Sequence, residues 1–171
     1  METTKSVWWV IPAWLLIVVY CFWWFEYRHW QSFQSLAVTF NGEDIHHLRS
    51  HVEASGNYTV MHFVDATCPC HDASLRHIQR LQEQVFDTQH VSIPIHLASG
   101  IPATPSVAIW DEAGELAYFG PYSSGAICGE GTDFVTRVLV ELRQKRNPRW
   151  INSIGVGCYC AGQSNEVSYV P

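Results

Sequence analysis

The N-terminal part of the chain, residues 1–30, follows a different pattern of hydrophobic and polar positions from the rest. Residues 7–25 (VWWVIPAWLLIVVYCFWWF) contain no Asp, Glu, Lys or Arg. As a helix this stretch would span about 28 Å, close to the hydrocarbon thickness of a bilayer. Tryptophans stand near both ends, where lipid headgroups favour their amphipathic rings. The stretch is too long for a signal peptide and no small-residue cleavage site follows it. We therefore expect one transmembrane helix over residues 7–25, within a membrane anchor formed by residues 1–30.

Beyond residue 30 the apolar positions alternate between the period of a strand and the period of a helix. Strand-like runs are predicted at residues 36–40, 58–65 and 91–97, and helices over 45–54, 71–86 and 132–146. The runs 106–110 and 116–119 flank Asp111-Glu112-Ala113-Gly114, which indicates a hairpin. Strand–helix–strand units require parallel pairing, while a hairpin adds antiparallel strands. The predicted fold class is therefore α/β, with a mixed sheet flanked by helices on both faces.

The helix over 71–86 is expected to turn one apolar stripe toward this sheet, made of Leu75, Ile78, Leu81 and Val85. Residues 31–150 have the size of one ordinary domain. Residues 151–171 form a tail that contains glycine and cysteine and is expected to end loosely.

The chain is acidic, with a formal net charge of −6, and it shows no basic stripe. Because Lys and Arg contacts to phosphate supply most nucleic-acid affinity, nucleic acid is excluded as a partner. His46, His47 and His51 are expected on a solvated helix face. His62 and His96 fall in predicted strands, where they are expected to be satisfied core or edge residues.

The candidate reactive site is Cys68-Pro69-Cys70, where a predicted buried strand ends and a predicted helix begins. A thiolate is the reactive form of cysteine, and a helix N-terminus lowers the pKa of a thiol placed there. A protonated His71 would lower it further. Asp65 precedes the motif and is a candidate proton carrier for the thiols, with capping of the following turn as the alternative.

A second pair, Cys158-Tyr159-Cys160, repeats the one-residue spacing on a glycine-rich segment. We expect this tail to fold back and act as a second dithiol that exchanges electrons with the first pair. Cys128 leaves an odd number of cysteines beyond the anchor, and it is a candidate resolving partner or a buried structural thiol. Cys21 lies in the apolar stretch and is read as a small hydrophobic residue.

Cys68-Pro69-Cys70 together with Thr104-Pro105-Ser106, the Gly114 turn and Gly120 resembles the thioredoxin-like superfamily over roughly residues 36–146. The chain is similar to a group of uncharacterised, membrane-anchored bacterial members of it. The resemblance implies a cis-proline at Pro105 beside the active-site cysteines, where it shapes the substrate site.

Two features depart from the family's pattern. The family's redox motif has two residues between its cysteines, whereas this one has only Pro69. If the Pro-Cys halves are aligned, Cys70 takes the resolving position and Thr67 the nucleophile's. If the first cysteines are aligned, Cys68 is the nucleophile and His71 stands at the resolving position. The segment 98–103 is also too short for the helix that normally precedes the cis-proline, so we expect that face of the sheet to be more open.

A disulfide between Cys68 and Cys70 would close a small, strained ring, and strained bridges are the more oxidising ones. We therefore expect a membrane-anchored thiol–disulfide oxidoreductase of the bacterial inner membrane. Its soluble domain would lie in the periplasm, its substrates would be protein thiols or disulfides, and it would need no cofactor. One alternative is a module that binds copper(I) or zinc through Cys68, Cys70, Cys158 and Cys160. Another is a redox-inert interaction domain.

Overall fold

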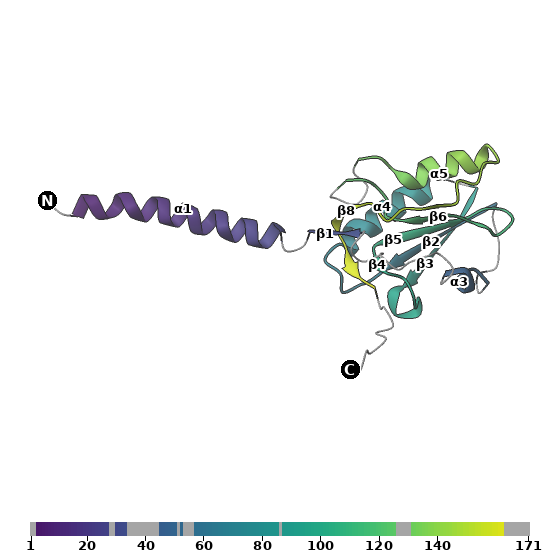
Figure 1. Cartoon of the computed structure of the whole chain (residues 1–171), viewed down its shortest axis with the longest axis horizontal. Coiled ribbons are helices and arrows are strands. Elements are labelled where there is room, and N and C mark those ends of the chain that lie inside the picture. Colours follow the sequence, from purple (N-terminus) through teal and green to yellow (C-terminus); the bar gives the residue numbers. More distant parts are fainter. Residues whose placement is uncertain are drawn as a thin grey trace. The chain divides into compact units, whose positions relative to one another are not determined.

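The computed structural model describes residues 3–27, 30–33, 45–50, 52, 57–85, 87–125 and 131–162. The chain divides into two units, Met1–Trp30 and Gln31–Pro171, which are described separately below (Figure 1).

The first unit consists of α1 (Thr3–Tyr27), the helix expected from the uncharged stretch. Its large apolar side chains are exposed; Trp9 is 80% and Phe25 is 72% accessible. Within the described residues, however, no helix is long and apolar enough to cross a membrane. The transmembrane segment predicted for residues 7–25 is therefore not found.

The second unit is built on a five-stranded mixed sheet, which confirms the predicted class. Its order is β3-β2-β5-β6-β7, formed by β3 (Thr88–Pro94), β2 (Tyr58–Val64), β5 (Ser106–Trp110), β6 (Leu116–Gly120) and β7 (Trp150–Ile151). β2 runs parallel to β3 and antiparallel to β5, β6 is antiparallel to β5, and β7 is parallel to β6. Every residue of β2 is buried, as its continuous apolar run predicts for a central strand.

One face of the sheet is covered by α4 (His71–Gln84) and α5 (Phe134–Arg143) (Figure 1). The inward stripe predicted for the first of these helices is partly wrong. Ile78, Leu81 and Val85 are buried, but Leu75 is 36% accessible and the polar residues Ser74 and His77 are buried. Compared with the prediction, the helix is therefore rotated about its axis, so that Ser74 and His77 lie among the side chains that face the sheet.

The opposite face is covered by α3 (His46–Ser50), by the 3-10 helix η2 (Ile95–Leu97) and by the chain that follows it. The strand predicted over 91–97 ends at Pro94 in β3, and η2 takes its last residues. The expectation that this face is open is wrong, because Ala98, Ile101 and Ala103 are fully buried there. The strand predicted over 36–40 lies outside the described residues.

The C-terminal tail is described as far as residue 162 and returns to the domain. β8 (Val156–Cys158) pairs with β1 (Trp30–Ser32), and β9 (Cys160–Ala161) pairs with β4 (Ala103–Thr104). In the second of these pairs Cys160 lies opposite Thr104. The loose end expected for the tail is not tested, because residues 163–171 lie outside the described part of the chain.

Candidate functional site: a doubly bridged cysteine cluster

The turn between β2 and α4 is shaped by Asp65. Its Oδ1 accepts hydrogen bonds from the Thr67 backbone N–H at 2.8 Å and from the Thr67 hydroxyl at 2.7 Å. These bonds hold the pKa of the Asp65 carboxyl below its usual range, so the group is ionised at neutral pH. This geometry matches the capping alternative for Asp65, since an ionised carboxylate engaged by the turn has no proton to give.

Two disulfides join this turn to the tail: Cys68 to Cys160 and Cys70 to Cys158. Their Cα–Cα separations of 6.0 and 5.9 Å lie in the ordinary range for disulfides. The expected return of the tail is confirmed, but the expected bridge between Cys68 and Cys70 is not. The tail crosses the turn in the opposite order, so that Cys160 is bonded to Cys68 and Cys158 to Cys70. No bridge therefore closes the small ring that a Cys68–Cys70 disulfide would form.

The four cysteines differ in their surroundings. Cys70 is the residue that precedes α4, and its carbonyl accepts a hydrogen bond from the Ser74 N–H at 3.0 Å. Cys68 and Cys70 are buried, with 5% and 4% accessibility, whereas Cys158 and Cys160 are partly exposed. A nucleophile from outside therefore reaches the tail sulfurs first, and a thiolate released at Cys70 would lie against the positive end of a helix.

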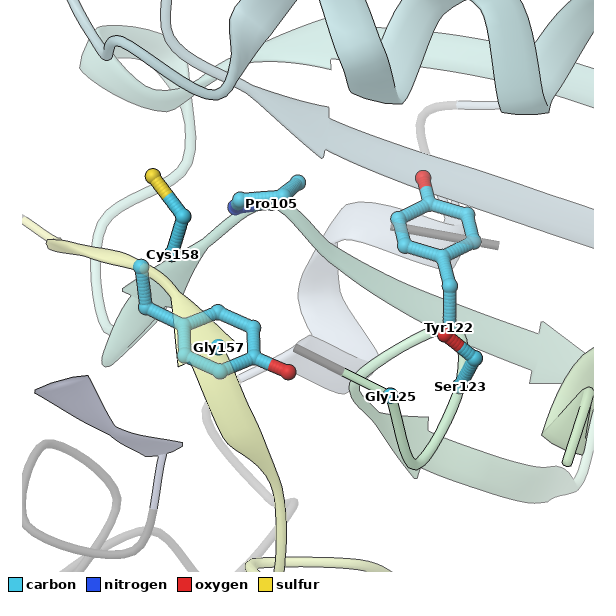
Figure 2. A pocket seen from close by; sticks show the side chains of 7 residues that line it. Pro105, Tyr122, Ser123, Gly125, Gly157 and Cys158 are labelled. Carbon is cyan, nitrogen blue, oxygen red and sulfur yellow. The ribbon is translucent and has the colours of Figure 1, made fainter. Parts of the chain in front are cut away.

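Pro105 lies beside this cluster, and its peptide bond with Thr104 is cis, as the resemblance implied. Pro105 and Cys158 line one small cavity with five further residues, which are Tyr122, Ser123, Gly125, Gly157 and Tyr159. Figure 2 shows the proline ring with Cys158 on one side and Tyr122 on the other. The cavity measures about 10 Å³, room for about one water molecule.

The remaining candidate residues lie apart from these bridges or give no further support. His71 is partly buried at the start of α4, and its Nδ1 has no hydrogen-bond partner within the described part of the chain. Cys128 lies outside the described residues, so its proposed resolving role stays a prediction. Cys21 is a free, exposed thiol on α1.

A cluster of histidines near the bridges was not anticipated from the sequence. His62 on β2 is fully buried; its Nδ1 lies 2.8 Å from the Tyr122 hydroxyl and its Nε2 lies 3.0 Å from His90 Nδ1. The ring of His77, from α4, meets the Tyr122 ring edge-on at 5.2 Å. The available signal was the alternation of β2, because Val60, His62 and Val64 must share one face of the sheet.

Burial sets the charge state of these rings. It lowers the pKa of His62 to about 3, with a further contribution from its neighbours His90 and His77. Burial also lowers the pKa of His77 and of His90. All three imidazoles are therefore neutral at pH 7.

Metal binding receives no support from this geometry. Within the described ranges, no group of three or more His, Cys, Asp or Glu side chains is arranged to hold a metal ion. Cysteine binds a metal as a free thiolate, whereas the four cysteines of the cluster are oxidised to two disulfides in this structure.

The chain belongs to the family described as Domain of unknown function (DUF6436), whose model matches residues 37–162. That match includes both cysteine pairs and Pro105, so the bridged cluster lies within the family's domain. No curated protein matches the sequence.

Proposed function

We propose that this protein is a thiol–disulfide oxidoreductase with a thioredoxin-like domain, acting through the Cys68–Cys160 and Cys70–Cys158 bridges. The observation that carries the proposal is the convergence of four cysteines from two distant segments at the start of α4, next to Pro105. The strand order β3-β2-β5-β6, with α4 between the two parallel strands, supports the thioredoxin-like assignment.

The chemistry follows from the different exposure of the two ends of each bridge. A substrate thiolate attacks the partly exposed sulfur of Cys158, the bond to Cys70 breaks, and its electron pair leaves on the Cys70 sulfur. A second substrate thiolate then attacks the substrate sulfur of this mixed disulfide and releases Cys158. The substrate dithiol loses two electrons and becomes a disulfide, and the protein bridge gains two. The same steps at Cys160 and Cys68 give the cluster a capacity of four electrons.

We also propose that the domain works in an oxidising compartment outside the cytosol. Bridges that close loops of this kind persist where thiols are not kept reduced, and the cytosol keeps them reduced.

The test is oxidation of a reduced peptide that contains two cysteines. Wild-type protein is compared with Cys70→Ser/Cys158→Ser and with Cys68→Ser/Cys160→Ser, pairs of substitutions that leave no orphan partner within the cluster. Single-turnover formation of the peptide disulfide is followed after acid quench. We expect each double variant to lose one of two equivalents of oxidation and the quadruple variant to lose both.

Cys21→Ser is the matched control, since Cys21 is a free thiol on a different unit of the chain. It should match the wild type in rate and in equivalents. If the quadruple variant oxidises the peptide as fast as wild-type protein does, the cluster is a structural cross-link and the proposed function is wrong.

A further inference from the structure

The end of the tail lies along β4 as an extended strand and is bonded to the turn beside it (Figure 1). β9 runs antiparallel to β4, with Cys160 opposite Thr104. The Gly162 N–H continues this ladder by donating to the Pro102 carbonyl at 2.8 Å. In the same register Cys160 is bonded to Cys68. The structure therefore shows how a cysteine in an extended strand along β4 reaches the Cys68 sulfur.

The position two residues after this cysteine has room for glycine and not for a side chain. A Cβ added to Gly162 would overlap the carbonyl oxygen of Ile101 and lie 2.8 Å from its carbonyl carbon. Because both atoms belong to the backbone, no side-chain rotation relieves this overlap. Ala161, by contrast, is exposed, so its position can carry other side chains. The edge of β4 therefore favours strands with the pattern Cys-x-Gly.

The disulfides are what make the attachment of the tail permanent. β9 has two residues and β8 has three, and strand pairings this short are weak by themselves. Packing adds to them, since Tyr159 is buried and its ring meets that of Phe33 edge-on at 5.2 Å. After reduction of both bridges the tail is held by such noncovalent contacts alone. Another strand can then compete with it for β4, as with any tethered ligand.

The register also determines which thiol a competing strand meets. In the tail, the cysteine opposite Thr104 is bonded to Cys68, whereas Cys158, on β8, is bonded to Cys70. Cys68 is buried in the oxidised cluster, so a polypeptide reaches it only after the tail has been displaced. Cys68 is therefore the nucleophile toward a strand that occupies β4.

We propose that residues 160–162 are a tethered occupant of a peptide-binding edge, and that after reduction β4 takes in their place an extended Cys-x-Gly segment of another polypeptide, whose cysteine is part of a disulfide. The inference rests on the proposed function, because this partner supplies the oxidising equivalents that the cluster passes on. Strand addition to an exposed sheet edge is a common way of binding extended peptides.

The exchange balances in two steps. The Cys68 thiolate attacks the sulfur of the Cys-x-Gly cysteine, and the electron pair of the broken bond leaves on the partner's other sulfur. The Cys160 thiolate then attacks Cys68 Sγ, restores the bridge and releases the partner's cysteine. Both partner thiolates take protons from water. The partner disulfide gains the two electrons that the Cys68–Cys160 dithiol loses.

The experiment traps the first step on the full chain with Cys70→Ser/Cys158→Ser/Cys160→Ser, in which Cys68 is the remaining thiol of the cluster. The probe is the blocked peptide Tyr-Cys-Ala-Gly, whose cysteine carries glutathione as a mixed disulfide. Attack on the peptide sulfur releases glutathione and leaves the peptide on Cys68. Mass spectrometry of proteolytic fragments measures this adduct and separates it from labelling of cysteines outside the cluster.

Tyr-Cys-Ala-Val is the matched peptide, since it differs only at the position that overlaps the Ile101 carbonyl. Below saturation it should label Cys68 roughly 10- to 100-fold more slowly than the glycine peptide, the range expected for overpacking. Tyr-Cys-Val-Gly, changed at the exposed position, should label Cys68 as fast as Tyr-Cys-Ala-Gly. Adding Gly162→Val to the protein weakens the tail as a competitor, so the glycine peptide should then react faster still.

Equal labelling of Cys68 by the glycine and valine peptides would overturn this inference, whatever the outcome for the proposed function. It is also wrong if reduced wild-type protein, reoxidised without peptide, forms mainly a dimer bridged from Cys68 to Cys160, because the occupant is then a second copy of the chain.

The proposed function is tested separately, by oxidation of a reduced two-cysteine peptide with wild-type protein. Failure there overturns that function and the reoxidation step, even if the glycine peptide is preferred on the variant. Should the triple variant fail to fold, as circular dichroism would show, Cys160→Ser replaces it, because this single variant keeps the Cys70–Cys158 bridge and frees Cys68.

Discussion

At the scale of single residues, the surroundings of His62 strongly lower the pKa of its side chain. It has no exposed surface, and its neighbours are two other neutral imidazoles and a phenol. A charged imidazolium there would lose its water and gain no counter-charge, so burial lowers its pKa from about 6.5 to about 3. Its protonation in the folded state is therefore disfavoured at every pH above about 3.

This shift makes the stability of the domain depend on pH. Between pH 6.5 and about 3 the unfolded chain binds a proton at His62 and the folded chain does not, so the free energy of unfolding falls as the pH falls. From pH 7.5 to pH 5 the loss from this residue should be about 2 kcal/mol. Urea denaturation at the two pH values measures it. His77 and His90, whose pKa values are also lowered, act in the same direction.

The variant His62→Gln has no titrating group at this position and should show a smaller difference between the two pH values. His46→Gln, an exposed histidine on α3, should keep the full wild-type difference. An equal pH dependence in wild type and His62→Gln would show that His62 is not its source.

The residues of the candidate site divide into those that the sequence predicts and those that it does not. Cys68 and Cys70 could be placed at a strand–helix junction because the buried run before them and the helical period after them are local. Their pairing with Cys160 and Cys158 depends on chain segments about ninety residues away, and no local pattern encodes it. The contact of His62 with Tyr122 was missed for the same reason.

At the scale of elements, α5 depends on Asp133. The Asp133 side chain accepts hydrogen bonds from the Thr136 N–H at 3.1 Å and from the Thr136 hydroxyl at 2.8 Å. The first of these satisfies a backbone donor that the first turn of a helix leaves unpaired. Since α5 carries five buried residues against the sheet, this cap contributes to the stability of the whole domain.

Asp133→Ala should lower the free energy of unfolding by about 1 kcal/mol, because the helix start then loses its side-chain acceptor. Asp133→Asn keeps a side chain of the same length with an acceptor oxygen. Its free energy of unfolding should stay within a few tenths of a kcal/mol of that of the wild type. Thermal unfolding followed by circular dichroism measures both. Equal losses in the two variants would indicate that charge, and not capping, is the contribution of Asp133.

The hydrophobic pattern predicted the major elements well and their details less well. β2, α4, the β5–β6 hairpin and α5 lie where long or strongly periodic patterns placed them. β3 is displaced toward its N-terminal side and gives way to η2, since a short half-buried edge strand carries little pattern. Leu75 is 36% accessible while Ser74 is buried, because the packing of α4 against the rest of the domain, which the helical period does not encode, sets the rotation of this helix.

At the scale of the whole molecule, the two bridges close long loops. The joined cysteines are 92 and 88 residues apart, so each bridge removes a large part of the freedom of the unfolded chain. The second bridge lies inside the loop closed by the first, and its own contribution is therefore smaller than that of an independent loop.

Reduction should thus destabilise the domain strongly. We expect a phosphine reductant to lower the free energy of unfolding by about 3–5 kcal/mol in urea denaturation, as for the loss of a long disulfide loop. The variant with all four cluster cysteines changed to serine is the control and should be insensitive to the reductant. A wild-type curve that the reductant leaves unmoved would mean that these bridges are absent in solution.

The large-scale arrangement was the least predictable part. Periodicity indicated one domain with a sheet between helices, and that is observed. The return of the tail was expected, but its pairing with β4 and the order in which its cysteines are bridged were not, because short, glycine-rich segments have no period. An uncharged stretch at the start of the chain likewise predicted a helix correctly, and its predicted passage through a membrane is not found.

The nested pairing also constrains how the protein is made. A ribosome releases the two cysteines of the β2–α4 turn long before it has translated their partners, which lie 92 and 88 residues further along the chain. Until then these two thiols can react only with each other, with Cys21 or Cys128, or with foreign thiols. Correct maturation therefore requires that oxidation wait until both tail cysteines have been translated, or that early mistakes be undone by thiol–disulfide exchange.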